Sequence, residues 1–143
     1  MKQIQLYKPG GLENLKLTDT ENPSPKDNEV LLKVHASSLN YHDLMVALGL
    51  IPTEDKRVPL SDGAGEIIEV GKDVSKWTVG DKVMSMCFPN WVSGPPKYNL
   101  LSFIGDNQDG YATELISIPE SAITKIPNNL NFKEAATLPC AGL

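Results

Sequence analysis

Short runs of alternating apolar and polar residues, each bounded by proline or glycine, are the main pattern of this sequence. The 11 prolines and 11 glycines separate β-branched stretches, as they do in barrels and sandwiches built from short strands. Strands are predicted over residues 3–6, 12–17, 29–36, 63–71, 111–118 and 123–126, and residues 77–84 are expected to form a Gly-Asp turn and a further strand. In the third of these ranges the alternation directs four side chains inward: Val30, Leu32, Val34 and Ala36. The pattern therefore predicts a mainly β protein.

A short helix is predicted directly after the third strand, from His42 to Leu48. Gly49 ends it, because glycine readily adopts the left-handed conformation of a C-terminal cap. Asp43 is expected to cap the start of this helix through its carboxylate. Residues 39–44 therefore form a strand-to-helix corner, which is a usual place for site residues.

A second helix is predicted near the end of the chain. Asn131 has the character of an N-cap, and Glu134 stands three residues on, where it completes a capping box. Pro139 bends or ends this helix. Apolar residues continue to Leu143, so we expect this tail to fold back onto the body or to pair with another copy.

The longest irregular stretch, residues 87–110, exceeds the usual length of a connection and is typical of a segment that covers a site. Trp91 and Tyr98 lie in it. Two interpretations stay open: they form the wall of a site for a flat apolar substrate, or they pack the loop onto the barrel. His35, within a strand, is expected to be structural.

Composition limits the possible functions. A chain of 143 residues with 41% hydrophobic content has room for one compact domain and a short appendage. No run of 18 apolar residues and no signal-peptide pattern occurs, so we expect a cytoplasmic protein without a membrane partner. The net charge is −5 and the 13 basic residues are scattered, which argues against nucleic acid as a partner.

The two cysteines, Cys87 and Cys140, lie 53 residues apart without a CxxC or a histidine-rich neighbourhood. They are expected to be reduced, buried thiols and not a disulfide or a preformed metal site. Gly63 and Gly65 do not form a dinucleotide fingerprint, because they precede a strand instead of following one.

Five motifs in a fixed order resemble the medium-chain dehydrogenase/reductase superfamily. They are Asn40-Tyr41-His42-Asp43, residues 61–71 (SDGAGEIIEVG), residues 79–83 (VGDKV), residues 110–114 (GYATE) and residues 135–143 (AATLPCAGL). The resemblance implies a GroES-like barrel with short helices over residues 1–128, which is the catalytic, substrate-binding domain. Residues 129–143 would be the start of the family's Rossmann domain, before which the chain is truncated. NADPH or NADH would be bound mainly by that absent domain.

Within this superfamily, the motifs indicate the branch without zinc, which is similar to the quinone reductases. Zinc-dependent members carry cysteine and histidine ligands at the places that here hold Asn40 and Ser61. Cys140 matches a third ligand, but a catalytic zinc requires three ligands of nitrogen, sulfur or carboxylate type. The structural zinc lobe also has no counterpart, because residues 87–110 contain only Cys87.

The resemblance assigns catalysis to Asn40, Tyr41 and His42. Asn40 would orient the nicotinamide or donate to the substrate oxygen; the alternative is that it only closes the turn after the strand. Tyr41 would also touch the cofactor; the alternative is that it packs against the protein. His42 would supply the proton that follows hydride, or it is a solvent-facing histidine at a helix start. Ser61 and Trp91 would contact the substrate. Some quinone reductases carry a tyrosine five residues after the asparagine, where this chain has Met45, so the proton donor stays open.

The function predicted is the substrate half of an NAD(P)H-dependent oxidoreductase that reduces quinones, enones or enals without a metal, with a small molecule as its partner. The fragment alone is expected to be inactive, and a homo-oligomer is possible. An NAD(P)-dependent alcohol dehydrogenase of the same superfamily is the second enzyme hypothesis. A GroES-like binding module without chemistry is the third.

Overall fold

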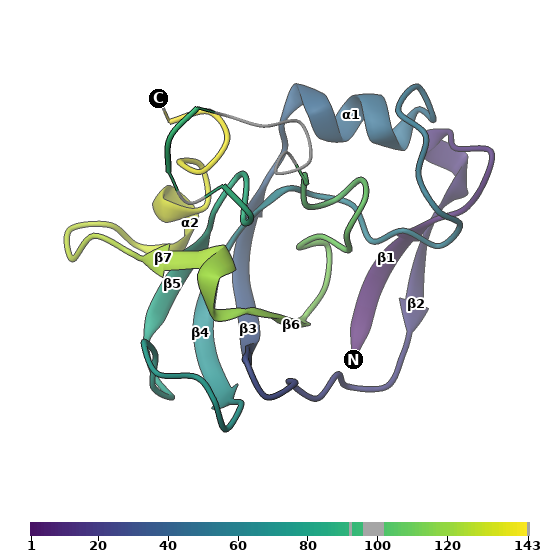
Figure 1. Ribbon diagram of the computed structural model, residues 1–143. Helices are drawn as coiled ribbons and strands as arrows, with labels where there is room; N and C mark the ends of the chain where they lie inside the picture. Colours follow the sequence, from purple (N-terminus) through teal and green to yellow (C-terminus); the bar gives the residue numbers. More distant parts are fainter. Residues whose placement is uncertain (92, 96–101, 143) are drawn as a thin grey trace.

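The computed structural model describes residues 1–91, 93–95 and 102–142. Within these residues, seven strands form two antiparallel sheets (Figure 1). The smaller sheet pairs β1 (Lys2–Leu6) with β2 (Leu15–Asp19). The larger sheet has the order β6-β3-β4-β5-β7. Its strands are β3 (Glu29–Ser38), β4 (Asp62–Val70), β5 (Lys82–Ser85), β6 (Leu115–Pro119) and β7 (Ile123–Lys125). The prediction of a mainly β fold is confirmed.

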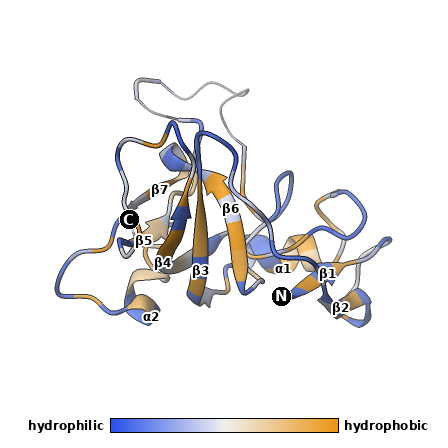
Figure 2. Cartoon of the chain, turned by 90° about the horizontal axis from the view of Figure 1, so that it is seen from below, coloured by the Kyte–Doolittle hydropathy of each residue, from blue (hydrophilic) through white to orange (hydrophobic). Residues whose placement is uncertain are grey.

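The core lies where β3, β4 and β6 meet. Val30 and Leu32 are completely buried, as the alternation predicted, and Ile67 of β4 is buried against them. Figure 2 colours β3 and β6 as mostly hydrophobic. Leu31, on the other face of β3, is also buried, and the pairing with β4 shifts register just after it. Strict alternation is therefore lost in this strand.

The predicted first helix is α1 (Tyr41–Ala47), one residue earlier at each end than the sequence indicated. Gly49 has a φ of 74°, so the predicted left-handed stop is confirmed. Short 3-10 turns occur at Leu12–Asn14 (η1) and Glu120–Ala122 (η3).

The prediction of a strand over residues 111–118 was wrong in its first half. The N–H groups of Tyr111 and Ala112 donate to the carbonyl oxygens of Leu60 and Pro59 instead of joining the sheet. These two bonds fasten the preceding loop to the segment just before β4. Ordered strand pairing begins at Leu115.

The chain's last helix, α2 (Phe132–Ala135), is a single turn. Its predicted capping box is present: Asn131 Oδ1 accepts from the Glu134 N–H, and the Glu134 carboxylate accepts from the Asn131 N–H. Ala135 and Ala136 are buried against Ala64 of β4. The described part of the tail therefore folds back onto the barrel. Leu143, for which the same was expected, lies outside the described residues.

Candidate functional site

The strand-to-helix corner is built where β3 ends beside the start of β4. Ser38 pairs with Asp62 at this edge of the sheet, and Asn40 follows as the N-cap of α1 with extended backbone angles of −112° and 160°. The Asn40 N–H donates to Asp43 Oδ2 at 2.8 Å. The expected capping role of the Asp43 carboxylate is thus confirmed.

The structure brings Asn40 and Ser61 into contact. Asn40 Nδ2 donates to Ser61 Oγ at 3.2 Å and to Asp62 Oδ2 at 2.9 Å. The Ser61 N–H donates to Asp43 Oδ1 at 2.9 Å. Because an amide nitrogen carries two hydrogens, both Asn40 donors are engaged within the protein. A substrate oxygen would have to replace one of these acceptors.

Asp62, for which no role was predicted, is the centre of this cluster. It is completely buried, and its Oδ2 also accepts from Ser38 Oγ at 3.2 Å and from the Cys140 N–H at 3.3 Å. Burial raises the pKa of Asp62 above its ordinary value, although the hydrogen bond from Asn40 opposes the shift. The available signal was an acidic residue opening a strand of small apolar residues.

Asp62 Oδ1 and the Tyr111 hydroxyl are both buried without a hydrogen-bond partner among the described residues. Burial, with a smaller effect of the Asp62 charge, raises the pKa of Tyr111. The tyrosine is therefore a neutral phenol at physiological pH.

Cys87 and Cys140 are both free, as predicted, but each is only partly buried. The two thiols lie near enough to each other to affect each other's pKa. Burial, followed by the proximity of Cys140 and Asp62, raises the pKa of Cys87 to about 12. Burial and the Asp62 charge also raise the pKa of Cys140. A spacing of 53 residues gave no sign that the fold would unite them.

His42 contacts a residue that the sequence analysis did not single out. Its Nε2 lies 3.0 Å from Asp106 Oδ2, and its ring packs on Phe103 with centroids 4.1 Å apart. Phe103 in turn meets Phe88 edge-on at 5.4 Å. The His42 ring is thus not free in solvent, which was the alternative to a catalytic role.

Tyr41 makes no hydrogen bond to the polar cluster in the described residues and is 77% exposed. It borders an apolar cavity of about 580 Å³. The other lining residues are Leu12, Leu15, Leu39, Asn40, Asp43, Leu44, Ala47, Pro59 and Leu60. Helical positions two apart point to nearly opposite sides, so Leu44 lies across α1 from His42.

Phe103 of the long loop reaches His42 at the corner, but no contact of the described residues brings Trp91 there. The Trp91 indole N–H donates to the Gly94 carbonyl oxygen within its own loop. Tyr98 lies outside the described residues. His35 is exposed and stacks on Phe132 with centroids 4.5 Å apart, which agrees with the structural role expected of it.

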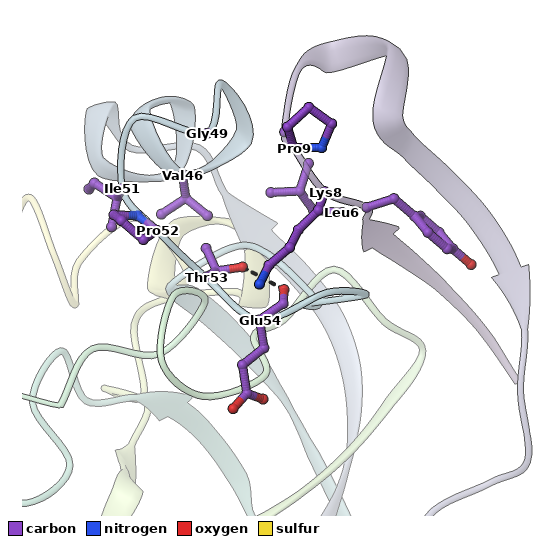
Figure 3. A pocket seen from close by; sticks show the side chains of 11 residues that line it. Leu6, Lys8, Pro9, Val46, Gly49, Ile51, Pro52, Thr53 and Glu54 are labelled. Atoms are coloured by element: carbon purple, nitrogen blue, oxygen red, sulfur yellow. Dashed lines mark hydrogen bonds between the residues drawn. The ribbon is translucent and has the colours of Figure 1, made fainter.

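A second cavity, of about 220 Å³, lies between the turn at residues 7–10 and the segment at residues 49–54. Figure 3 shows Lys8, Pro9, Thr53 and Glu54 around it. It contains none of the predicted site residues, so we do not assign it to the corner.

The places of the three zinc ligands converge in space, but the side chains that occupy them do not fit zinc. Asn40 and Ser61 present an amide and a hydroxyl, which are bonded to each other. Cys140 is the one side chain of the three that zinc prefers, and a catalytic zinc needs three such ligands. Within residues 1–91, 93–95 and 102–142, no group of three or more His, Cys, Asp or Glu side chains is placed to hold a metal ion.

Comparison with known proteins identifies the family. Residues 26–128 match the alcohol dehydrogenase GroES-like domain. The chain therefore belongs to this family, within the medium-chain dehydrogenase/reductase superfamily. No helix in the described part of the chain is long and apolar enough to cross a membrane.

Similar proteins carry oxidoreductase names of two kinds. A zinc-type alcohol dehydrogenase-like protein of Schizosaccharomyces pombe is 40% identical over 137 residues, covering 93% of this chain and 40% of that protein. A chloroplast envelope quinone oxidoreductase homolog of Arabidopsis thaliana is 35% identical, covering 94% and 37%. The quinone oxidoreductase of Coxiella burnetii has a TM-score of 0.78 at 32% identity, covering 99% and 42%. The chain thus spans about two fifths of the length of these relatives.

Proposed function

We propose that this chain is the amino-terminal, substrate-binding part of a longer NAD(P)H-dependent oxidoreductase that reduces quinones, enones or enals without zinc. The observation that carries the proposal is the chemistry of the side chains at the corner. The three ligand places of the zinc-dependent branch lie together, yet they hold an amide, a hydroxyl and a protonated thiol. A carbonyl bound there would be polarised by hydrogen bonds.

The nicotinamide cofactor, when bound, supplies the hydride, and residues outside this chain would hold most of it. Asn40 and Tyr41 would border its nicotinamide end. Ser61 would support the substrate oxygen through its hydroxyl, which Asn40 already contacts. His42 would deliver the proton. We also propose a cytoplasmic location, since the two free thiols are typical of a reducing compartment.

A zinc-dependent alcohol dehydrogenase is the second candidate. It is favoured by the name of the 40% identical relative and by Cys140, which occupies a ligand place. Under this hypothesis Asp62 would have to replace the missing ligands. Its carboxylate is already engaged by Asn40, Ser38 and the Cys140 backbone.

Metal analysis and kinetics on the longer protein separate these hypotheses. We expect less than about 0.1 zinc per chain and NAD(P)H oxidation that depends on a quinone or an enone and persists in chelator. One tightly bound zinc per chain together with alcohol oxidation would establish the second candidate. Absence of both activities, with the fold intact, would favour a binding module.

A further inference from the structure

The segment that carries Asp106, residues 104–111, is fastened beside the corner by backbone hydrogen bonds. The Gly105 N–H donates to the Gln108 carbonyl oxygen at 2.8 Å, and the Tyr111 N–H donates to the Leu60 carbonyl oxygen at 2.8 Å. A Cβ at Gly110 would overlap the backbone of Pro59 and Leu60. The loop is therefore packed directly on the residue before Ser61.

Asp106 is only 9% exposed, and its two oxygens have different partners. Oδ1 accepts from the Asn107 N–H, and Oδ2 meets His42 Nε2. The His42 side chain keeps 27% of its surface exposed. Its Nδ1 has no hydrogen-bond partner among the described residues.

The other acidic groups near His42 are engaged elsewhere. Asp43, the next residue in α1, directs its carboxylate to the N–H groups of Asn40 and Ser61. Asp62 accepts from Asn40, Ser38 and Cys140. Phe103, the other residue packed on His42, carries no charge. Asp106 is thus the carboxylate that acts on this imidazole within the described part of the chain.

We propose that Asp106 is a positioning residue that holds His42 for proton delivery. This inference rests on the function proposed above and identifies His42 as its proton donor. By accepting from Nε2, the carboxylate keeps a proton on that nitrogen and fixes the ring. The imidazolium then gives its Nδ1 proton to the oxygen left negative after hydride addition. A neutral imidazole with hydrogen on Nε2 remains, and solvent reprotonates Nδ1 through the exposed edge.

A purely structural role does not require this pair. The loop is already fastened by its backbone hydrogen bonds to Pro59 and Leu60, and a partly exposed histidine needs no buried carboxylate to satisfy it. The Phe103 ring excludes water from one face of the imidazole, which strengthens the charge-assisted bond. These features favour orientation of the ring as the function of Asp106.

Nitrogen NMR on the 143-residue chain tests the geometry without any activity. The chain has two histidines, so His35→Gln leaves His42 as the single imidazole. Above about pH 8, where histidine is ordinarily neutral, we expect hydrogen on Nε2, and a mixture of tautomers in Asp106→Ala. Hydrogen on Nδ1, or a tautomer mixture before the substitution, would overturn the proposal.

Kinetics on the longer protein test the role. We expect Asp106→Ala to lower kcat at least roughly tenfold with less than about a twofold change in KM. Asp106→Asn should lower kcat less, because its amide oxygen can still accept a hydrogen bond from Nε2. The double variant His42→Asn with Asp106→Ala should have a kcat no lower than that of His42→Asn alone. Asp27→Asn, in an exposed pair with Lys72, is the control.

Thermal unfolding of each variant separates loss of orientation from loss of fold. Additive losses in the double variant, or unchanged kcat in a folded Asp106→Ala protein, would overturn the proposal. A wild-type protein without reductase activity would overturn the proposed function and the catalytic role with it, while the NMR measurement would still report whether Asp106 holds His42.

Discussion

At the scale of single residues, burial of polar groups decides the chemistry of the corner. Asp62 is completely buried, and Asn40, Ser38 and the Cys140 N–H all donate to one of its oxygens. A buried carboxylate is tolerated when it is hydrogen-bonded. Each donor therefore contributes both to the geometry of the site and to the stability of the fold.

Asn40→Ala should lower kcat/KM of the longer protein at least roughly tenfold, equivalent to about 1.4 kcal/mol. The substitution removes the amide that contacts Ser61 and Asp62. It should also lower the free energy of unfolding by about 1–3 kcal/mol, because Asp62 loses one of its donors. Steady-state kinetics and urea unfolding measure the two effects. Asn28→Ala, at an exposed position, is the control. Unchanged kinetics in Asn40→Ala would mean that Asn40 only closes the turn after β3.

Cys87 should react slowly with alkylating reagents in the folded protein, because the thiolate is the reactive form. Burial raises the pKa of its thiol to about 12, so the native protein keeps the proton that the unfolded chain releases near its ordinary pKa. Stability from this group is complete below pH 9 and is lost as pH rises toward 12. Mass spectrometry at pH 8 should show alkylation at least roughly tenfold slower than in urea. Equal rates would show that the thiol is not desolvated.

At the scale of elements, close packing between β4 and the loop leading to β6 fixes the corner. Gly63, at the start of β4, lies against the Tyr111 ring, where a Cβ would overlap. Tyr111 is itself 1% exposed, so its ring has no room to move. The small residues of the sequence motif are thus required by packing.

Gly63→Ala should lower the free energy of unfolding by about 2 kcal/mol, since overpacking of a full core forces side chains or backbone to shift. Urea unfolding monitored by circular dichroism measures the loss. Ser121→Ala, at an exposed position in η3, should change stability by less than about 0.5 kcal/mol. A Gly63→Ala variant as stable as this control would mean that Tyr111 can be displaced.

At the scale of the whole molecule, an apolar cavity adjoins the polar cluster, because Asn40 and Asp43 belong to the cluster and also line the cavity. Leu39 and Tyr41 are 83% and 77% exposed beside that cavity. Exposed apolar groups of this size commonly mark a contact with another protein segment. They fit the proposal that a longer protein continues beyond this chain.

The 143-residue chain alone should bind NADPH more weakly than micromolar. Tight dinucleotide binding requires a glycine-rich turn at a helix N-terminus, and the sequence contains none. Contacts from Asn40 and Tyr41 to the nicotinamide would have to offset the entropy of association unaided. Calorimetric titration is the measurement, and micromolar affinity would show that the cofactor site lies within this chain.

The sequence by itself determined the mainly β class, the strand-to-helix corner at Asn40, the stop at Gly49 and the capping box at Asn131. These features depend on local alternation, capping and backbone preference, which neighbouring residues determine. The motifs also brought Asn40, Ser61 and Cys140 together as candidates. Strand pairing was misjudged at Tyr111 because its N–H finds a distant carbonyl, on Leu60.

Only the tertiary structure revealed Asp62 as the centre of the cluster, Asp106 as the partner of His42, and the proximity of Cys87 to Cys140. Asp106 lies 64 residues from His42, and sequence patterns carry no information about which distant side chains meet. Burial of Asp62 depends on two distant segments that converge on it, residues 38–40 and the tail with Cys140. Such convergence is decided by the packing of the whole chain, because hydrogen bonds and desolvation act through space and not along the backbone.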